Sequence, residues 1–159
     1  MKPVDNLMDQ QKQNETKATA RGHYSEGLLR IKEGKFEDAI TCFSHAISLQ
    51  LTTVEYYFAR AKCYFAIRQY HKYVCDLSLA MHVEAENFIL YMARAHGLFQ
   101  LGQYQQALVD MTSARDLYED YFKVEEQRRK DQNSPLSRHM RTTPASQVRA
   151  DILYRLGVT

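Results

Sequence analysis

The residue types best suited to chemistry in this chain are a few histidines and cysteines spaced for one face of a helix. His71 and Cys75 are four residues apart and His82 follows two turns later, a pattern that resembles half of a zinc site. Structural zinc needs four ligands, and no second pair stands at a defined spacing. Cys42 with His45 is no stronger. We therefore predict no metal, and ordinary helix-surface positions for these residues.

Signatures of catalysis are missing from the sequence. It has no Gly-rich phosphate loop, no nucleophile elbow and no paired carboxylates, and its acidic residues are expected on exposed helix faces. We predict a protein that is not an enzyme and takes no cofactor. The three cysteines are odd in number and lie within predicted helices, which favours reduced thiols. Cys63 is expected to serve as a small buried apolar residue.

Composition favours one compact helical domain. Of 159 residues, 45% are apolar and 25% charged, and only 6 Gly and 3 Pro interrupt helices. No apolar run approaches the roughly 18 residues that a membrane span needs, and the start lacks a secretory signal pattern. We therefore expect no membrane partner and a cytoplasmic location, with the cytoskeleton or a cilium as further options.

The elements that must position these residues follow a period of 34 residues. Three turn signals recur at this interval: Gly34-Lys35-Phe36, Arg68-Gln69-Tyr70 and Gly102-Gln103-Tyr104. Three sets of apolar residues follow in register: Ala39, Tyr73 and Ala107; Phe43, Leu77 and Met111; Ala46, Ala80 and Ala114. Small residues precede each turn by seven positions: Gly27, Ala61 and Ala95. This period predicts stacked pairs of antiparallel helices.

These residues resemble the tetratricopeptide repeat (TPR) family, in units of about 20–53, 54–87 and 88–121. The resemblance implies an all-α fold, an α-solenoid of three antiparallel helical hairpins that acts as a protein interaction module. Among the departures from the family pattern, two concern the helix ends and the helix spacing. The Pro that usually closes each repeat is absent, so helices can run on. Tyr73 replaces a small Ala, so its ring is expected to widen the helix spacing or to swing to the edge.

Both ends of the chain extend beyond the repeats. Residues 1–18 are polar and expected to be disordered. No breaker follows Tyr104 before residue 133, which predicts a long final helix, and 122–142 is assigned as charged extended helix and linker. Thr143 and Pro144 signal a further helix over 143–159. It is either a cap or the first half of a fourth repeat, because Ala150 and Tyr154 fall in the repeat's first-helix register.

Family members that grip a chaperone's C-terminal carboxylate do so with Lys, Asn and Arg on their first helices. The matching positions here are Tyr24, Leu28, Ala59, Ile89 and Ala93, and none of them can hold a carboxylate. Arg60 and Arg94 lie one place later and are expected to point along the hairpin seam. The resemblance therefore implies a partner other than such a tail.

The concave groove is predicted to be largely apolar. Its expected lining is Tyr24, Leu28, Ile31, Phe58, Lys62, Phe65, Met92, His96 and Phe99. A contiguous apolar patch of that size is rarely left open to water. It is expected to hold an amphipathic helix or extended segment of a protein partner, the chain's own C-terminal segment with Ile152 to Leu156, or a second copy.

The C-terminal part is mildly basic, since residues 123–159 hold 8 Lys and Arg against 4 Asp and Glu. Five of these eight residues form the candidate basic tail: Arg128, Arg129, Lys130, Arg138 and Arg141. They could meet an acidic protein surface or RNA, or simply solvate a linker. Nucleic acid is disfavoured because no aromatic platform is interleaved with them.

Two functions from different classes remain. One is an adaptor that binds a partner's apolar segment in the groove. The other is a structural subunit of a larger assembly, such as a ciliary or microtubule, import or cell-cycle complex, with the basic tail on an acidic surface. An adaptor should lose affinity on Phe58→Ala or Phe99→Ala, whereas a subunit should be poorly soluble or oligomeric alone.

Overall fold

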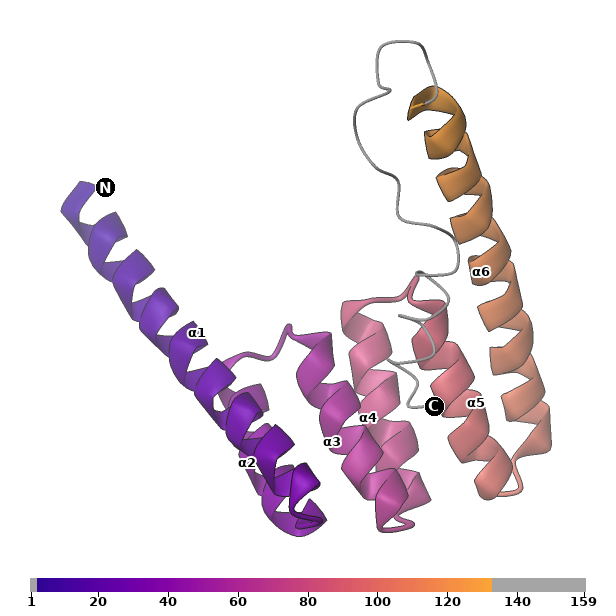
Figure 1. The fold of residues 1–159 in the computed structure, drawn as a ribbon, viewed down its shortest axis with the longest axis horizontal. Coiled ribbons are helices and arrows are strands. Elements are labelled where there is room, and N and C mark those ends of the chain that lie inside the picture. The colour runs from indigo at the N-terminus through magenta and orange to yellow at the C-terminus, as the bar shows by residue number, and fades with distance from the viewer. Residues whose placement is uncertain (1–2, 133–159) are drawn as a thin grey trace.

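The computed structural model describes residues 3–132, with side chains from residue 9 to residue 129, and this part of the chain is entirely helical. Its helices are α1 (Pro3–Lys32), α2 (Phe36–Leu49), α3 (Val54–Ala66), α4 (Tyr70–Val83), α5 (Phe88–Gln100) and α6 (Tyr104–Gln132). Each helix packs against the next along the chain, which gives three antiparallel hairpins side by side (Figure 1). The expectation of an all-α solenoid with a long final helix is confirmed.

The three turns inside the hairpins share one backbone conformation. Gly34 and Gly102 have φ of 75° and 73°, the left-handed region that glycine enters without steric cost. The amide after each turn residue donates to a carbonyl five residues earlier, as in Lys35 N to Arg30 O at 2.9 Å. This is the Schellman arrangement that ends a helix. Arg68 adopts the same conformation, with φ of 59°.

Replacing Arg68 with glycine is expected to stabilise the protein by about 0.5–1 kcal/mol. A side chain in the left-handed region crowds the following carbonyl, and glycine removes that contact. The gain should appear as a higher urea midpoint in circular dichroism at 222 nm. Gly34→Ala is the matched control and should lower the midpoint. An unchanged or lower midpoint for Arg68→Gly would contradict the expectation.

The N-terminal segment differs from its prediction. Residues 3–18 were expected to be disordered, but α1 begins at Pro3 and runs through them. Pro suits the first turn of a helix, and the Gln, Lys, Glu and Ala residues that follow are good helix formers. The side chains of residues 9–15 are all exposed, so this part projects from the repeats without packing (Figure 1).

The absence of the closing prolines does not lengthen α2 or α4. α2 and α4 end at Leu49 and Val83, and four-residue linkers lead to the next hairpins. Only α6 continues past the corresponding position, Leu117, as far as Gln132. The end of the predicted linker, 133–142, and the predicted helix over 143–159 lie outside the described residues.

The core is built from the residues in the repeat register. Phe43 and Leu77 are fully buried at the same position of successive units, together with Ala39, Ala46 and Ala80. Phe43 lies directly over Gly27, where a Cβ atom would stand 2.5 Å from the ring. Small residues in the first helix therefore set how closely each hairpin closes.

Tyr73 is accommodated without being pushed to the edge. The ring lies against Gly97, whose missing side chain leaves the room, since a Cβ there would stand 2.5 Å from Tyr73 Cδ1. Its hydroxyl donates to the Ala93 carbonyl at 2.9 Å, and only 6% of the residue is exposed. Burial raises the pKa of this phenol. A large residue in one hairpin is thus matched by a glycine in the next.

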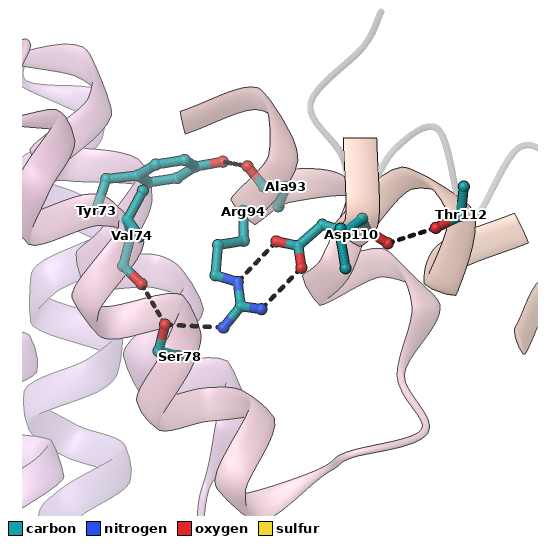
Figure 2. Close-up of polar contacts among 8 residues, drawn as sticks. Tyr73, Val74, Ser78, Ala93, Arg94, Asp110 and Thr112 are labelled. Carbon is teal, nitrogen blue, oxygen red and sulfur yellow. Dashed lines mark hydrogen bonds and ion pairs between the residues drawn. The ribbon is translucent and has the colours of Figure 1, made fainter. Parts of the chain in front are cut away.

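A polar network repeats between successive hairpins. The Arg60 guanidinium binds both carboxylate oxygens of Asp76, at 2.8 and 2.7 Å, and donates to Ser44 Oγ at 2.9 Å. One period later Arg94 makes the same contacts with Asp110 and Ser78 (Figure 2).

The network ties the second helix of one hairpin to both helices of the next. It places the two arginines in the hairpin seam, as expected. Asp76 and Asp110 are 3% and 4% exposed, so the expectation that the acidic residues lie on exposed faces is wrong for these two. Both carboxylates lie within the helix packing because each has an arginine partner.

Candidate functional site

The first helices of the hairpins form one side of the solenoid, and a groove of about 760 Å³ opens on this side. Its walls come from α1, the first residue of α2, α3, the start of α5 and the linker before α5. The lining residues are Tyr24, Leu28, Ile31, Phe36, Val54, Glu55, Phe58, Ala59, Lys62, Cys63, Glu84, Asn87, Ile89 and Leu90. Most of them are apolar, so the groove suits burial of apolar surface.

Part of the groove wall is formed by packed aromatic rings. Tyr24 lies between Tyr56 and Phe43, at ring-centroid distances of 5.1 and 5.6 Å. Burial raises the pKa of the Tyr24 hydroxyl, so this phenol remains neutral at physiological pH. The opposite wall carries Phe58, whose ring lies 5.8 Å from Lys62 Nζ. This distance allows a cation–π contact that holds the ammonium at the groove edge.

The charge of the groove is mixed and small. Lys62 is its only cation, and Glu55 and Glu84 are its acidic residues. Cys63 lies beneath the floor, with only 1% of its surface exposed, against Ala39 and Ala59. Burial raises the pKa of this thiol to about 11, so it is a packing residue at neutral pH and not a nucleophile.

Comparisons with known proteins agree with the arrangement of the helical hairpins. No family model matches the chain. The small glutamine-rich tetratricopeptide repeat-containing protein of Dictyostelium discoideum is 34% identical over 65 residues, 41% of this chain and 20% of that protein. The chain thus matches one fifth of the length of this relative.

Solved structures share the arrangement of the hairpins. The second TPR of Spaghetti (RPAP3), bound to the HSP90 peptide SRMEEVD, superposes with a TM-score of 0.62 and 24% identity, over 67% of this chain and 98% of that one. The Arabidopsis OM64 TPR domain has a TM-score of 0.60 and 22% identity, over 64% and 84%. The 34-residue period recurs in both sequence and structure. This chain has the tetratricopeptide-repeat (TPR) fold.

In this TPR fold, five of the nine residues expected to line the groove do so: Tyr24, Leu28, Ile31, Phe58 and Lys62. The other four lie elsewhere. Phe65 packs against Tyr73 and His96, with ring centroids 5.0 and 4.9 Å away, and so fills the space between α3, α4 and α5. Phe99 is 59% exposed beside Tyr104 at its own hairpin turn. Met92 is half-buried on α5 outside the groove.

The error has a geometric cause. The prediction extended the groove evenly along all three first helices, whereas its lining uses only the beginning of α5. Residues toward the end of α5, such as His96 and Phe99, therefore lie beyond it. The contributions of Phe36, Glu84 and Asn87 were missed because they come from α2 and a linker. No first-helix register identifies such residues.

Four of the five positions that match the carboxylate-gripping residues of the family lie on the groove. They are Tyr24, Leu28, Ala59 and Ile89. The fifth, Ala93, is buried in the core. None of the five is a cation or an amide.

The basic tail is only partly described. Arg128 pairs with Glu125 at 3.0 Å and is 68% exposed. Arg129 borders a shallow depression on α6 that also includes Tyr118, Tyr121 and Phe122. The side chains of Lys130, Arg138 and Arg141 lie outside the described residues. The described part of this helix carries both signs of charge, and aromatic residues lie beside it.

The residues first considered for metal binding are separate surface residues. His71, Cys75 and His82 are exposed on α4. Across the described residues, no group of three His, Cys, Asp or Glu side chains is arranged to hold a metal ion. In the same part of the chain, no helix combines the length and apolar character that crossing a bilayer requires.

Proposed function

We propose that this TPR protein is a non-catalytic adaptor that binds an apolar helical or extended segment of a protein partner in the groove between α1, α3 and the start of α5. The observation that carries the proposal is the lining of this groove. Tyr24, Leu28, Ile31 and Phe58 present aromatic and aliphatic surface around the single cation Lys62. Burying a partner's apolar side chains against such a surface favours binding.

The same lining argues against an acidic C-terminal tail as the ligand. A carboxylate taken out of water needs cationic or amide donors. At the matching positions this groove offers Tyr24, Leu28, Ala59 and Ile89, and Glu55 and Glu84 add repulsion. The RPAP3 domain was solved with the peptide SRMEEVD, so that peptide provides a direct negative probe.

Binding tests this proposal. Helical 15-residue peptides selected from a displayed library on the full chain, then synthesised with a fluorophore, are expected to share apolar residues at i, i+3 or i+4, and i+7. Phe58→Ala should weaken the best peptide about 10-fold or more in fluorescence anisotropy, because an aromatic anchor is lost. Phe99→Ala, originally expected to matter equally, becomes the matched control because Phe99 lies outside the groove.

The outcome that contradicts the proposal is equally specific. Selected peptides that end in acidic residues, or SRMEEVD binding that is weakened by Phe58→Ala but not by Phe99→Ala, would assign the groove to a carboxylate ligand. Equal losses for Phe58→Ala and Phe99→Ala would indicate a general effect on folding.

The alternative is a structural subunit held permanently in a larger assembly, with the basic tail on an acidic surface. The observation in its favour is the exposed apolar surface at the end of the stack, including Leu108, Val109 and Met111 on α6. A subunit of this kind should self-associate when isolated, whereas the adaptor should be monomeric. Light scattering at micromolar concentration separates the two.

A further inference from the structure

The last helix of the stack leaves uncovered a face that the earlier hairpins cover. Met111 on α6 is 49% exposed, although Phe43 and Leu77 at the same repeat position are 0% exposed. Leu108 is 61% exposed, whereas its counterparts Ile40 and Val74 are partly buried. In the first two units this face packs against the first helix of the following hairpin. α6 therefore presents the surface that such a helix would cover.

The polar network contains a third hydroxyl on this face. Ser44 and Ser78 each donate to a backbone carbonyl on their own helix and accept from an arginine of the next hairpin. Thr112 falls one period after Ser78 and donates to the Val109 carbonyl at 2.8 Å (Figure 2). Within residues 9–129 no arginine donates to it. The face of α6 that a following first helix would cover thus offers a hydroxyl group as well as apolar side chains.

We propose that residues 143–157 of this chain cover this face of α6 as the first helix of a fourth hairpin. The register supports this segment as the occupant. A shift of 55 residues, one period plus an insertion of 21, places Arg149 at Arg94 and Ala150 at Ala95. Arg149 then donates to the Thr112 hydroxyl, as Arg94 does to Ser78.

Side-chain size supports the same pairing. Where α4 carries the large Tyr73, the facing residue on α5 is Gly97. Where α2 carries Ala39, the facing residue on α3 is the larger Cys63 in the same cluster. The third pair in this register is Ala107 with Ile152. A small residue on α6 again meets a large one, which keeps the volume between the helices filled.

The 21-residue insertion is long enough for the chain to return from the end of α6 to the start of the proposed helix. α6 continues 15 residues past Leu117, the counterpart of the last residue of α2 and α4. At 1.5 Å per residue this overhang is about 22 Å. Residues 133–142 can span up to about 35 Å when extended. They therefore reach from the end of α6 back to the level at which a first helix begins.

The test is hydrogen–deuterium exchange on the full chain. Amides of residues 145–156 are expected to exchange at least 10-fold more slowly than in a synthetic peptide of the same residues. Leu108→Asp should remove this protection, because it places a charge against the proposed helix, while protection in α2 to α5 should stay unchanged. Gln105→Asp is the matched control, since Gln105 is exposed on the same helix at the position of the exposed Glu37 and His71.

Swapping the sizes of the two residues proposed to face each other, Ala107 and Ile152, provides a second, independent test. Ala107→Tyr should release residues 145–156 by filling the space assigned to Ile152. Combining Ala107→Tyr with Ile152→Gly should restore protection, because it recreates the Tyr73 and Gly97 pair. A general loss of folding would not be rescued in this way.

Three results would overturn the proposal. The first is exchange of residues 145–156 at the rate of the free peptide. The second is protection that survives Leu108→Asp but is lost on Phe58→Asp, which would place the segment in the groove. The third is protection that disappears on dilution, which would assign the face of α6 to a second copy of the chain.

Discussion

Replacing Asp76 with alanine is expected to destabilise the protein by about 3 kcal/mol or more. The Asp76 carboxylate is 3% exposed and accepts two hydrogen bonds from Arg60, whose side chain is 17% exposed. Removing one partner of such a pair leaves the other charge without compensation inside the helix packing. The Asp76 bond is also the largest cause of the raised pKa of Arg60. Without that bond the guanidinium still stays charged, because arginine is protonated throughout the physiological pH range.

The measurement is urea unfolding followed by circular dichroism. Amide hydrogen–deuterium exchange in α3 and α4 then shows where the stability is lost. Asp116→Ala is the matched control, because the Asp116 side chain is 63% exposed and its pair with Arg115 should contribute little. Replacing both members of the buried pair, Arg60→Met with Asp76→Leu, should recover most of the stability. A loss below about 1 kcal/mol for Asp76→Ala would mean that water replaces the carboxylate.

Phe43→Ala is expected to cost about 3–5 kcal/mol, the range for a fully buried aromatic residue. Phe43 has no exposed surface, touches Gly27 across the first hairpin and packs against Tyr24 with ring centroids 5.6 Å apart. Its loss leaves a cavity between α1 and α2. Because Tyr24 also lines the groove, the cavity should loosen the wall at which the partner is proposed to bind.

Thermal unfolding and peptide anisotropy on the same variant check this second prediction. Leu51→Ala is the control, since Leu51 is 64% exposed in the linker after α2. It should change stability by less than about 0.5 kcal/mol. If Phe43→Ala lost stability while peptide affinity stayed unchanged, the groove wall would not depend on the first hairpin's core.

Local features were predictable from the sequence because they depend on neighbours within one hairpin. The turns at Gly34 and Gly102 need a residue that accepts positive φ. The long α6 follows from the absence of a breaker after Tyr104. The N-terminal half of α1 was missed because a polar helix without a buried face resembles a disordered segment in composition.

The repeat period by itself determined the fold class, the turns within the hairpins and most of the residues that form the core, because each depends on apolar spacing along one helix and on turn chemistry. Only the tertiary structure decided where the groove ends, that Tyr73 fits against Gly97 and that Asp76 is buried with Arg60. These features join residues 16 or more positions apart, on different helices. Their geometry depends on how far successive hairpins rotate and approach, which no single register encodes.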